Sequence, residues 1–211
     1  MATARLRWRV VALLLVGLAA CTSAEATLST SFLTPQLKDA YIPLYGIGGY
    51  GARYAAAVSI APNIAVTNDH NANLVAEDAV LGRSRDYDLL FFRTDRPAVP
   101  LARPSIGQNV IAYGQYGMKR RKEAAGVIRD IEIYLPSRCS DCRRQKTIAY
   151  DAEAGQGFSG GPVVDAVSGE VLGITAYLEN GAAENGGRRM YAYDIDLVLE
   201  EMHRLLDNRT P

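Results

Sequence analysis

The stretch Gly155-Gln156-Gly157-Phe158-Ser159-Gly160-Gly161-Pro162-Val163-Val164-Asp165 places one serine among glycines and directly before an apolar strand-like run. Glycines permit unusual backbone angles and let a second chain approach the main chain closely. Such closeness allows backbone N–H groups to meet an oxygen that becomes negative during acyl transfer. The stretch therefore predicts that Ser159 is a nucleophile.

The residues around the serine decide between two enzyme architectures. Residues 157–161 formally match G-x-S-x-G, the nucleophile elbow of α/β-hydrolases, in which the serine opens a helix and the acid and histidine follow it. Here Pro162 and two valines follow the glycines, which is a poor start for a helix. Only His203 lies downstream, and we expect it on the surface of a terminal helix. The elbow interpretation therefore fails.

The other architecture places histidine, aspartate and serine in that order along the chain. His70 follows the apolar run 64–67, Asp88 begins the apolar run 88–92, and Ser159 comes last. With these motifs the chain resembles the trypsin/chymotrypsin-like serine peptidases, especially compact bacterial members related to the periplasmic heat-shock proteases and the glutamyl endopeptidases. The resemblance covers about residues 46–206.

The chain has the strand pattern of an all-β protein. Short apolar or alternating runs are separated by Gly, Pro and Asn, which indicates an antiparallel barrel or sandwich. The resemblance implies two antiparallel β-barrels, at about 45–115 and 116–193, followed by a C-terminal α-helix. Pro62-Asn63 and Ser168-Gly169 are predicted hairpin turns, and Asp194 or Asp196 is the predicted helix cap.

The resemblance implies a role for each residue of the motif. Ser159 would attack the scissile carbonyl, and His70 would take its proton and later pass it to the leaving amine. Asp88 would hold the imidazole in the required tautomer. The backbone N–H groups of Gly157 and Ser159 would form the oxyanion hole. No metal or organic cofactor is implied.

Two departures from the family pattern bear on activity. Phe158 stands where relatives usually carry Asp or Asn, so it either fills a core pocket or tilts the Gly157 peptide and spoils the oxyanion hole. Asp69 adds a negative charge beside His70. Asp69 and Asp86 also compete with Asp88 for the role of the acid.

Specificity is predicted only by position. Counting six residues back from the serine puts Glu153 at the floor of the substrate pocket, which would favour a basic side chain before the scissile bond. Thr175, Ala176 and Tyr177 match the strand that lines this pocket. Thr175 stands where the Glu-specific relatives carry histidine, which argues against strict cleavage after Glu.

The N-terminus has the layout of an export signal. Three arginines precede the apolar run 10–18, which is about half the ~20 residues of a membrane-spanning helix. The signal ends Leu18-Ala19-Ala20-Cys21, which resembles the lipobox of bacterial lipoproteins, where the cysteine is lipidated. Lipidated Cys21 would anchor the protein in the cell envelope, with the outer membrane facing the periplasm favoured. Cleavage after Ala24 would instead give a soluble periplasmic or secreted protein.

The domain prediction follows from these signals. Residues 1–20 are the predicted lipoprotein signal, 21–44 a tether rich in Ser, Thr and Ala, and 45–211 the peptidase domain. Cys139 and Cys142 are expected to form a small-loop disulfide, since the envelope is oxidising. A zinc site needs about four ligands, and the chain has two histidines and no second cysteine pair to supply them.

Composition limits the partners. The 211 residues carry 23 basic and 23 acidic side chains, which disfavours a nucleic-acid binder. The basic cluster at 119–122 is interpreted as a solvated loop between strands, or else as a patch for lipid headgroups or an anionic partner. The predicted partner is a peptide or protein substrate, and the oligomeric state is unknown. The alternatives to a serine endopeptidase are a catalytically silent module that binds peptides on the same fold and, more remotely, an esterase.

Overall fold

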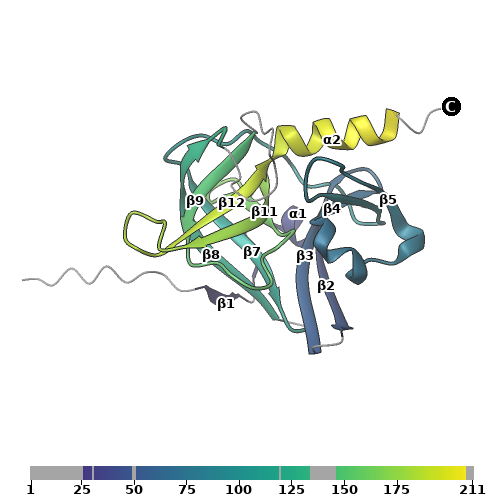
Figure 1. The fold of residues 1–211 in the computed structure, drawn as a ribbon, viewed down its shortest axis with the longest axis horizontal. Helices are drawn as coiled ribbons and strands as arrows, with labels where there is room; N and C mark the ends of the chain where they lie inside the picture. Colours follow the sequence, from purple (N-terminus) through teal and green to yellow (C-terminus); the bar gives the residue numbers. More distant parts are fainter. Residues whose placement is uncertain (1–25, 30, 49–50, 119, 134–145, 208–211) are drawn as a thin grey trace, which may run out of the picture.

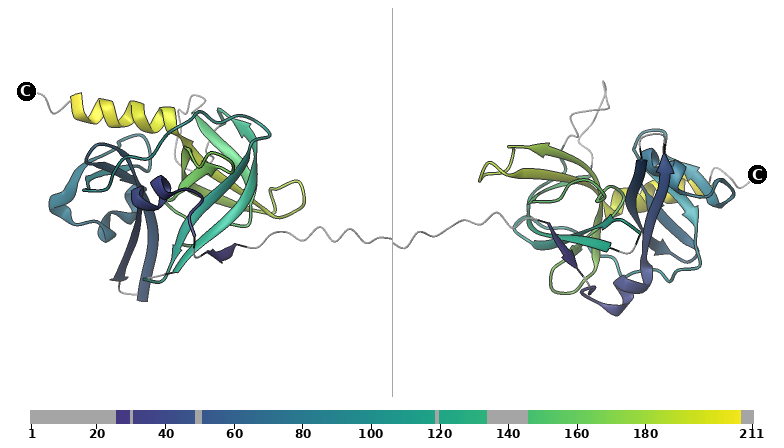
Figure 2. Two further views of the ribbon diagram at one scale, coloured as in Figure 1. Left: turned by 180° about the vertical axis from the view of Figure 1, so that it is seen from behind. Right: turned by 90° about the horizontal axis from the view of Figure 1, so that it is seen from below.

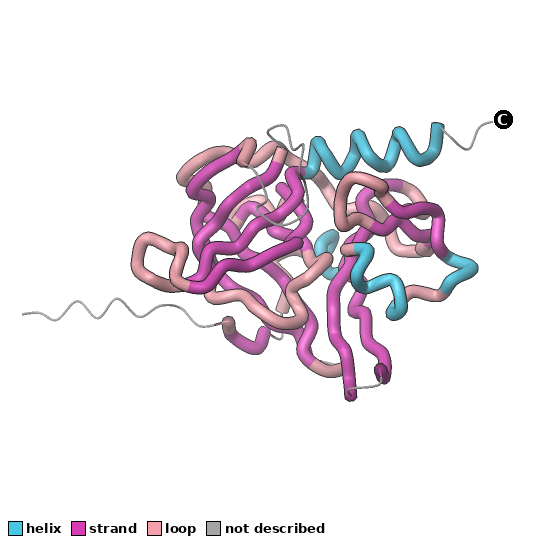
Figure 3. The backbone as a smooth tube through the Cα atoms, in the orientation of Figure 1, coloured by secondary structure: helices cyan, strands magenta, loops and turns pink. Residues whose placement is uncertain are grey.

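The computed structural model describes residues 26–29, 31–48, 51–118, 120–133 and 146–207. Strands dominate these residues, and the one long helix is C-terminal (Figure 3). The elements in chain order are β1 (Thr27–Ser29), α1 (Pro35–Ala40), β2 (Tyr41–Gly48), β3 (Gly51–Ala61), β4 (Ile64–Thr67), η1 (Asp69–Leu74), η2 (Glu77–Ala79), β5 (Val80–Arg83), β6 (Leu90–Arg93), β7 (Asn109–Tyr116), β8 (Arg120–Ile131), β9 (Thr147–Ala152), β10 (Pro162–Asp165), β11 (Val171–Asn180), β12 (Arg188–Asp194) and α2 (Ile195–Asp207).

The strands form two antiparallel units that lie side by side (Figure 1). Strands β8-β7-β10-β11-β12-β9 form a barrel that the pairing of β8 with β9 closes, and β1 adds to its β8 edge. The first half of the chain forms a five-stranded sheet in the order β2-β3-β4-β6-β5. Helix α2 leaves the barrel and runs across to the sheet. The predicted all-β fold with a C-terminal helix is confirmed.

Local turn and cap signals correspond to the elements they predicted. Asn63 turns the β3–β4 hairpin at φ 63°, and Gly169 turns the β10–β11 hairpin at φ 75°. The carboxylate of Asp194 accepts the N–H of Asp196 at 2.8 Å and so caps α2. Burial raises the pKa of Asp194. Of the two predicted caps, Asp194 is therefore the correct one.

The apolar core consists of three clusters, one in each unit and one between the units. One apolar cluster fills the closed barrel, and a smaller one lies between the sheet and the residues of η1 and η2. The third cluster joins the units and includes Phe91 of the sheet, Ile174 of the barrel and Val198 of α2. The two units are therefore packed against each other by a shared apolar interface.

The N-terminal segment differs from the predicted tether in its described part. Strand β1 pairs with β8, and Leu37 and Ala40 of α1 are fully buried in the interface cluster. Figure 2 shows this segment crossing the back of the molecule, between the barrel and the sheet. The apolar face of α1 explains the difference, since composition alone hid two core positions among polar residues.

The division between the units also differs from the prediction. Strand β7 pairs with β8 and β10 in the closed barrel, so the boundary lies between β6 and β7 rather than near residue 115. The prediction of a solvated basic loop at 119–122 is wrong for its described residues. Arg121 is buried in β8, and its guanidinium lies 3.6 Å from the centre of the Phe32 ring.

Three sequence predictions fall on residues that the structure does not describe. The signal at 1–20, the lipidation of Cys21 and the disulfide between Cys139 and Cys142 all lie outside the described ranges. Among the described helices, none is long and apolar enough to cross a membrane.

Candidate active site

The pairing of β4 with β6 brings His70 and Asp88 together. Thr67 ends β4 opposite Leu90, which begins β6, so the residues just beyond these two strand ends are neighbours. His70 lies in the first turn of η1, directly after β4, and Asp88 lies two residues before β6. Two positions 18 residues apart in sequence thus become adjacent because of one strand register.

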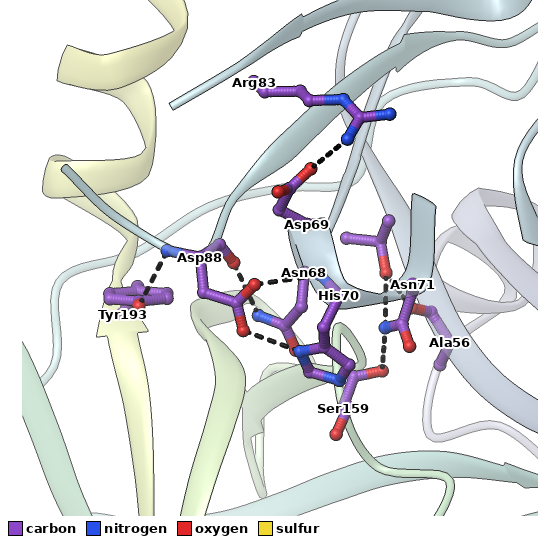
Figure 4. Close-up of polar contacts among 10 residues, drawn as sticks. Ala56, Asn68, Asp69, His70, Asn71, Arg83, Asp88, Ser159 and Tyr193 are labelled. Carbon is purple, nitrogen blue, oxygen red and sulfur yellow. Dashed lines mark hydrogen bonds and ion pairs between the residues drawn. The ribbon is translucent and has the colours of Figure 1, made fainter. Parts of the chain in front are cut away.

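The carboxylate of Asp88 holds His70 at two points (Figure 4). Oδ2 lies 2.6 Å from Nδ1 of the imidazole, and Oδ1 accepts the backbone N–H of His70 at 2.9 Å. Asp88 is itself fixed through its backbone, because its N–H donates to the Tyr193 hydroxyl and its C=O accepts from Asn68 Nδ2, both at 3.0 Å. The side chain of Asp88 is 10% exposed and that of His70 is 38% exposed. The imidazole therefore faces solvent while its Nδ1 side is anchored in the protein.

Ser159 lies in the loop between β9 and β10, and the first unit holds its backbone. Its C=O accepts the N–H of Ala56 at 3.1 Å and Nδ2 of Asn71 at 3.3 Å (Figure 4). Thr67 Oγ1 joins the same group, since it donates to the C=O of Ala56 at 2.8 Å and accepts from Asn71. A loop of the barrel is thus fastened to the sheet that carries His70.

The glycines after the serine are required by this close approach. A Cβ at Gly160, whose φ is +76°, would lie 2.0 Å from Thr67 Oγ1 and 2.4 Å from the C=O of Ala56. No side chain fits in that space, so the loop can dock on the sheet only with glycine there.

Residues 155–158 form a turn that orients two backbone N–H groups. Phe158 N–H donates to the C=O of Gly155 at 3.1 Å, and Gly157 has φ +89°, which is the geometry of a type II turn. The C=O of Gly157 accepts the N–H of Gln115 on β7 at 2.8 Å. In the described part of the chain the N–H groups of Gly157 and Ser159 donate to no protein acceptor. They remain available to an oxygen of a bound molecule.

Phe158 fills a core position. Its side chain is 1% exposed and packs in the apolar cluster of the closed barrel. Of the two outcomes considered for this residue, core filling is the one observed, and the turn that carries Gly157 keeps its positive φ.

His70, Gly157 and Ser159 line one open cavity of about 450 Å³. In the described chain, no hydrogen bond joins the hydroxyl of Ser159 to the imidazole of His70. Catalytic hydrogen bonds of this kind are often long without substrate. The cavity therefore holds a hydroxyl, an imidazole anchored on a carboxylate, and two free N–H groups.

The competing acids lie elsewhere. Asp69 forms an ion pair with Arg83 at 3.4 Å, and Asp86 lies exposed in the turn before β6. His203 is exposed on α2, as predicted. Of the three carboxylates considered, Asp88 is the one that contacts the ring of His70.

The predicted pocket residues do not line this cavity. Oε1 of Glu153 accepts the backbone N–H of Arg188 at 3.3 Å, and its carboxylate lies 4.0 Å from the Arg188 guanidinium. Thr175 is buried and its hydroxyl contacts that of Tyr150 at 2.9 Å. Burial raises the pKa of Tyr150. Tyr177 is 42% exposed and packs beside Tyr191.

Ala176, the remaining predicted pocket residue, is half-buried between Thr175 and Tyr177. No group of three or more potential metal ligands occurs among the described side chains.

Several residues of the site were not predicted from the sequence. Asn68 and Asn71 flank His70, and both are buried as hydrogen-bond donors. Their closeness to the histidine in sequence was the only available signal. Gln115 and Tyr193 reach the site from distant strands, and no local pattern marks them.

A family comparison agrees with this geometry. Residues 53–174 match the trypsin-like peptidase domain, which is more than half of the chain. The chain belongs to the trypsin-like peptidase family. The match includes His70, Asp88, Gly157 and Ser159.

Solved structures share the fold at low sequence identity. The HtrA-type protease AlgW, solved with a tripeptide, is 21% identical with a TM-score of 0.67, and the match covers 83% of this chain and 63% of that chain. The Rv3671c protease from M. tuberculosis in its active form is 18% identical with a TM-score of 0.65, covering 82% of this chain and 83% of that one. The serine endoprotease from Yersinia pestis is 21% identical with a TM-score of 0.64, covering 86% and 68%.

This trypsin-like peptidase thus spans less than two thirds of the AlgW chain. No curated protein sequence matches it significantly.

Proposed function

We propose that this trypsin-like peptidase hydrolyses peptide bonds through an acyl-enzyme formed on Ser159. The hydroxyl oxygen of Ser159 attacks the scissile carbonyl carbon while His70 takes the hydroxyl proton. The carbonyl oxygen becomes negative and accepts hydrogen bonds from the N–H groups of Gly157 and Ser159. His70 then gives the proton to the leaving amine, and the C–N bond breaks. Water then attacks the carbonyl carbon of the ester in the same way, with His70 as the base, which releases the acid and regenerates the serine.

One observation carries the proposal. The 2.6 Å contact between Asp88 Oδ2 and His70 Nδ1 fixes the proton of the imidazole on Nδ1 and leaves Nε2 as the acceptor. The same His70 lines the cavity with Ser159 and Gly157. This combination supports the proposal that His70 as base, Ser159 as nucleophile and the N–H of Gly157 as oxyanion donor act on one substrate carbonyl.

A fluorophosphonate probe tests the proposal. We expect wild-type protein to be labelled at Ser159, and we expect Ser159→Ala and His70→Ala to remain unlabelled. The second histidine supplies a matched control, because His203 is exposed on α2 and His203→Ala should label as wild type does. Absence of labelling in folded wild-type protein would refute the proposed activity. Peptide binding without turnover would then favour the catalytically silent binding module.

We further propose that the protein works in the bacterial cell envelope, with lipidated Cys21 as its anchor. The support is in the sequence, where three arginines, a short apolar run and Leu18-Ala19-Ala20-Cys21 follow one another. A labelled fatty acid should appear on the wild-type protein and be absent from Cys21→Ser. Unlabelled wild type, found as a soluble protein, would indicate ordinary secretion instead.

A further inference from the structure

The cavity that starts at Ser159 extends along one side of the site, between the two units. Tyr54 of β3 and Tyr116 of β7 line it beyond His70, and their ring centres are 6.5 Å apart. Two cations complete its walls, Arg53 from the sheet and Lys122 from the barrel. No Asp or Glu is among the described residues that line it.

Among the described residues, neither cation has a carboxylate partner. Arg53 donates to the neutral Oδ1 of Asn73 at 3.3 Å, and Lys122 Nζ lies 4.4 Å from the centre of the Tyr116 ring. No ion pair joins either side chain to a carboxylate within the described ranges. Other basic side chains do have such partners, as Arg83 and Arg204 do. The cavity therefore presents two uncompensated positive charges beside the nucleophile.

The edge of β3 that borders this cavity is open to an extended chain. The N–H of Ala56 points at Ser159 and its C=O accepts from Thr67, so the backbone groups of Ala56 face away from β2. Because strand geometry alternates, those of Tyr54 face the same way. Strand β4 pairs with β3 only from Val58 onward. A substrate strand leaving Ser159 can thus pair with β3 at Tyr54.

The cavity receives the part of the substrate that follows the scissile bond. By the family resemblance, the part before that bond lies along Thr175–Tyr177, and these residues do not line the cavity. An extended chain advances about 3.3 Å per residue, so the first three residues after the bond span about 10 Å of the cavity.

We propose that this peptidase selects substrates with a carboxylate in the first three residues after the scissile bond, bound by Lys122 and Arg53. This inference rests on the proposed function. The carboxylate is that of an Asp or Glu side chain, or of a C-terminus close to the cut.

Matched peptides test the selection. From a peptide that the enzyme cleaves, three versions are made: Glu at the second position after the bond with an amidated end, Gln there with an amidated end, and Gln with a free C-terminal carboxylate one residue later. We expect kcat/KM for the Glu peptide to exceed that for the amidated Gln peptide about tenfold at low salt, since a charged hydrogen bond stabilises the complex. The advantage should shrink at high salt because ions screen the attraction. The third peptide shows whether a terminal carboxylate serves equally.

Variants assign the preference to the two cations. Lys122→Gln should lower the Glu/Gln ratio several-fold, and Arg53→Gln with Lys122→Gln should bring it close to one. Lys122→Arg should restore it, since the charge returns. Arg93→Gln is the matched control, because Arg93 is an exposed cation at the end of β6 that does not line the cavity. The ratio should be unchanged there.

A binding measurement separates this inference from the proposed function. In Ser159→Ala, fluorescence polarisation of the same peptides compares their affinities without turnover. Equal affinities, or an equal kcat/KM in wild type, would overturn the carboxylate selection while leaving the peptidase activity intact. Preferential binding of the Glu peptide without fluorophosphonate labelling of wild type would instead refute the activity and retain the site.

Discussion

Replacing Asp88 with Asn tests the proposed mechanism most directly, because it removes a charge and keeps the shape. In the structure Oδ1 accepts the backbone N–H of His70 at 2.9 Å and Oδ2 faces Nδ1 at 2.6 Å. Asparagine offers one acceptor oxygen and one NH₂ donor for these two positions. At one of the two positions the variant must therefore place a donor where the wild-type protein has an acceptor.

The two orientations of the amide differ in free energy. If the NH₂ faces the backbone N–H, two donors oppose each other, and a buried unpaired donor costs about 1–3 kcal/mol. The favoured orientation thus turns the NH₂ toward Nδ1, which must then accept, and the imidazole proton moves to Nε2. That is the nitrogen that should take the proton of Ser159.

The expected loss of rate follows from both effects. Reaching the working tautomer costs about 1–3 kcal/mol, and losing a charged hydrogen bond to the imidazolium costs about 1.5–3 kcal/mol. Together these lower kcat by about 10²–10⁴-fold. The protein should remain folded, since the side chain keeps its size in a site that is largely buried.

The assay is kcat on a peptide substrate, with the rate of fluorophosphonate labelling as a second readout. Asp69→Asn and Asp86→Asn are the controls, because neither carboxylate contacts the ring of His70. We expect both to stay within a few-fold of wild type, because Asp86 is exposed and half-buried Asp69 pairs with the exposed Arg83, and ion pairs at a surface contribute about 0–1 kcal/mol. Activity of Asp88→Asn within tenfold of wild type, or a larger loss in Asp69→Asn, would refute the reasoning.

Three further changes have defined outcomes. Gly157→Ala should lower kcat at least about 100-fold. The new Cβ would lie 2.0 Å from the C=O of Gln115, so the turn, in which Gly157 has φ +89°, would move and displace an oxyanion donor. Kinetics of the folded variant check this. Phe158→Ala should lower the free energy of unfolding by about 3–5 kcal/mol, since a 1% exposed ring leaves a cavity; urea titration measures it, and a change under about 1 kcal/mol contradicts it. For Glu201, burial acts to raise the pKa, but hydrogen bonds from Arg204 and Ser84 outweigh burial and lower the pKa. The ionised carboxylate therefore stabilises the folded protein above about pH 4.3, and this contribution is lost as the pH falls further. Glu201→Gln should therefore flatten the fall of unfolding free energy below about pH 5, and an unchanged slope would contradict this.

The sequence predicted those parts of the molecule whose signals are local. The order of His70, Asp88 and Ser159 could be read along the chain, and the hairpin turns and the cap of α2 each depend on a few neighbouring residues. Their side chains determine the backbone nearby, so no knowledge of the tertiary structure was needed.

The missed features depend on contacts between distant segments. Strand β1 has three residues, Thr-Leu-Ser, and is a strand only because it pairs with β8. Arg121 looked solvated among other basic residues, yet Phe32, which is 89 positions earlier, covers its guanidinium. The contact between Glu153 and Arg188 likewise joins a loop to a strand, and it was invisible to counting back from the serine.

The two hydrogen bonds to the carbonyl of Ser159 make the geometry of the site depend on how the barrel packs against the sheet. The nucleophile comes from the barrel and the base from the sheet, and Ala56 and Asn71, on the side of the base, donate to the serine carbonyl. A small separation of the barrel from the sheet would break both bonds at once and move Ser159 away from His70. Loss of activity on heating should therefore precede loss of strand structure. The rate of turnover would then report whether the interface between the barrel and the sheet is intact.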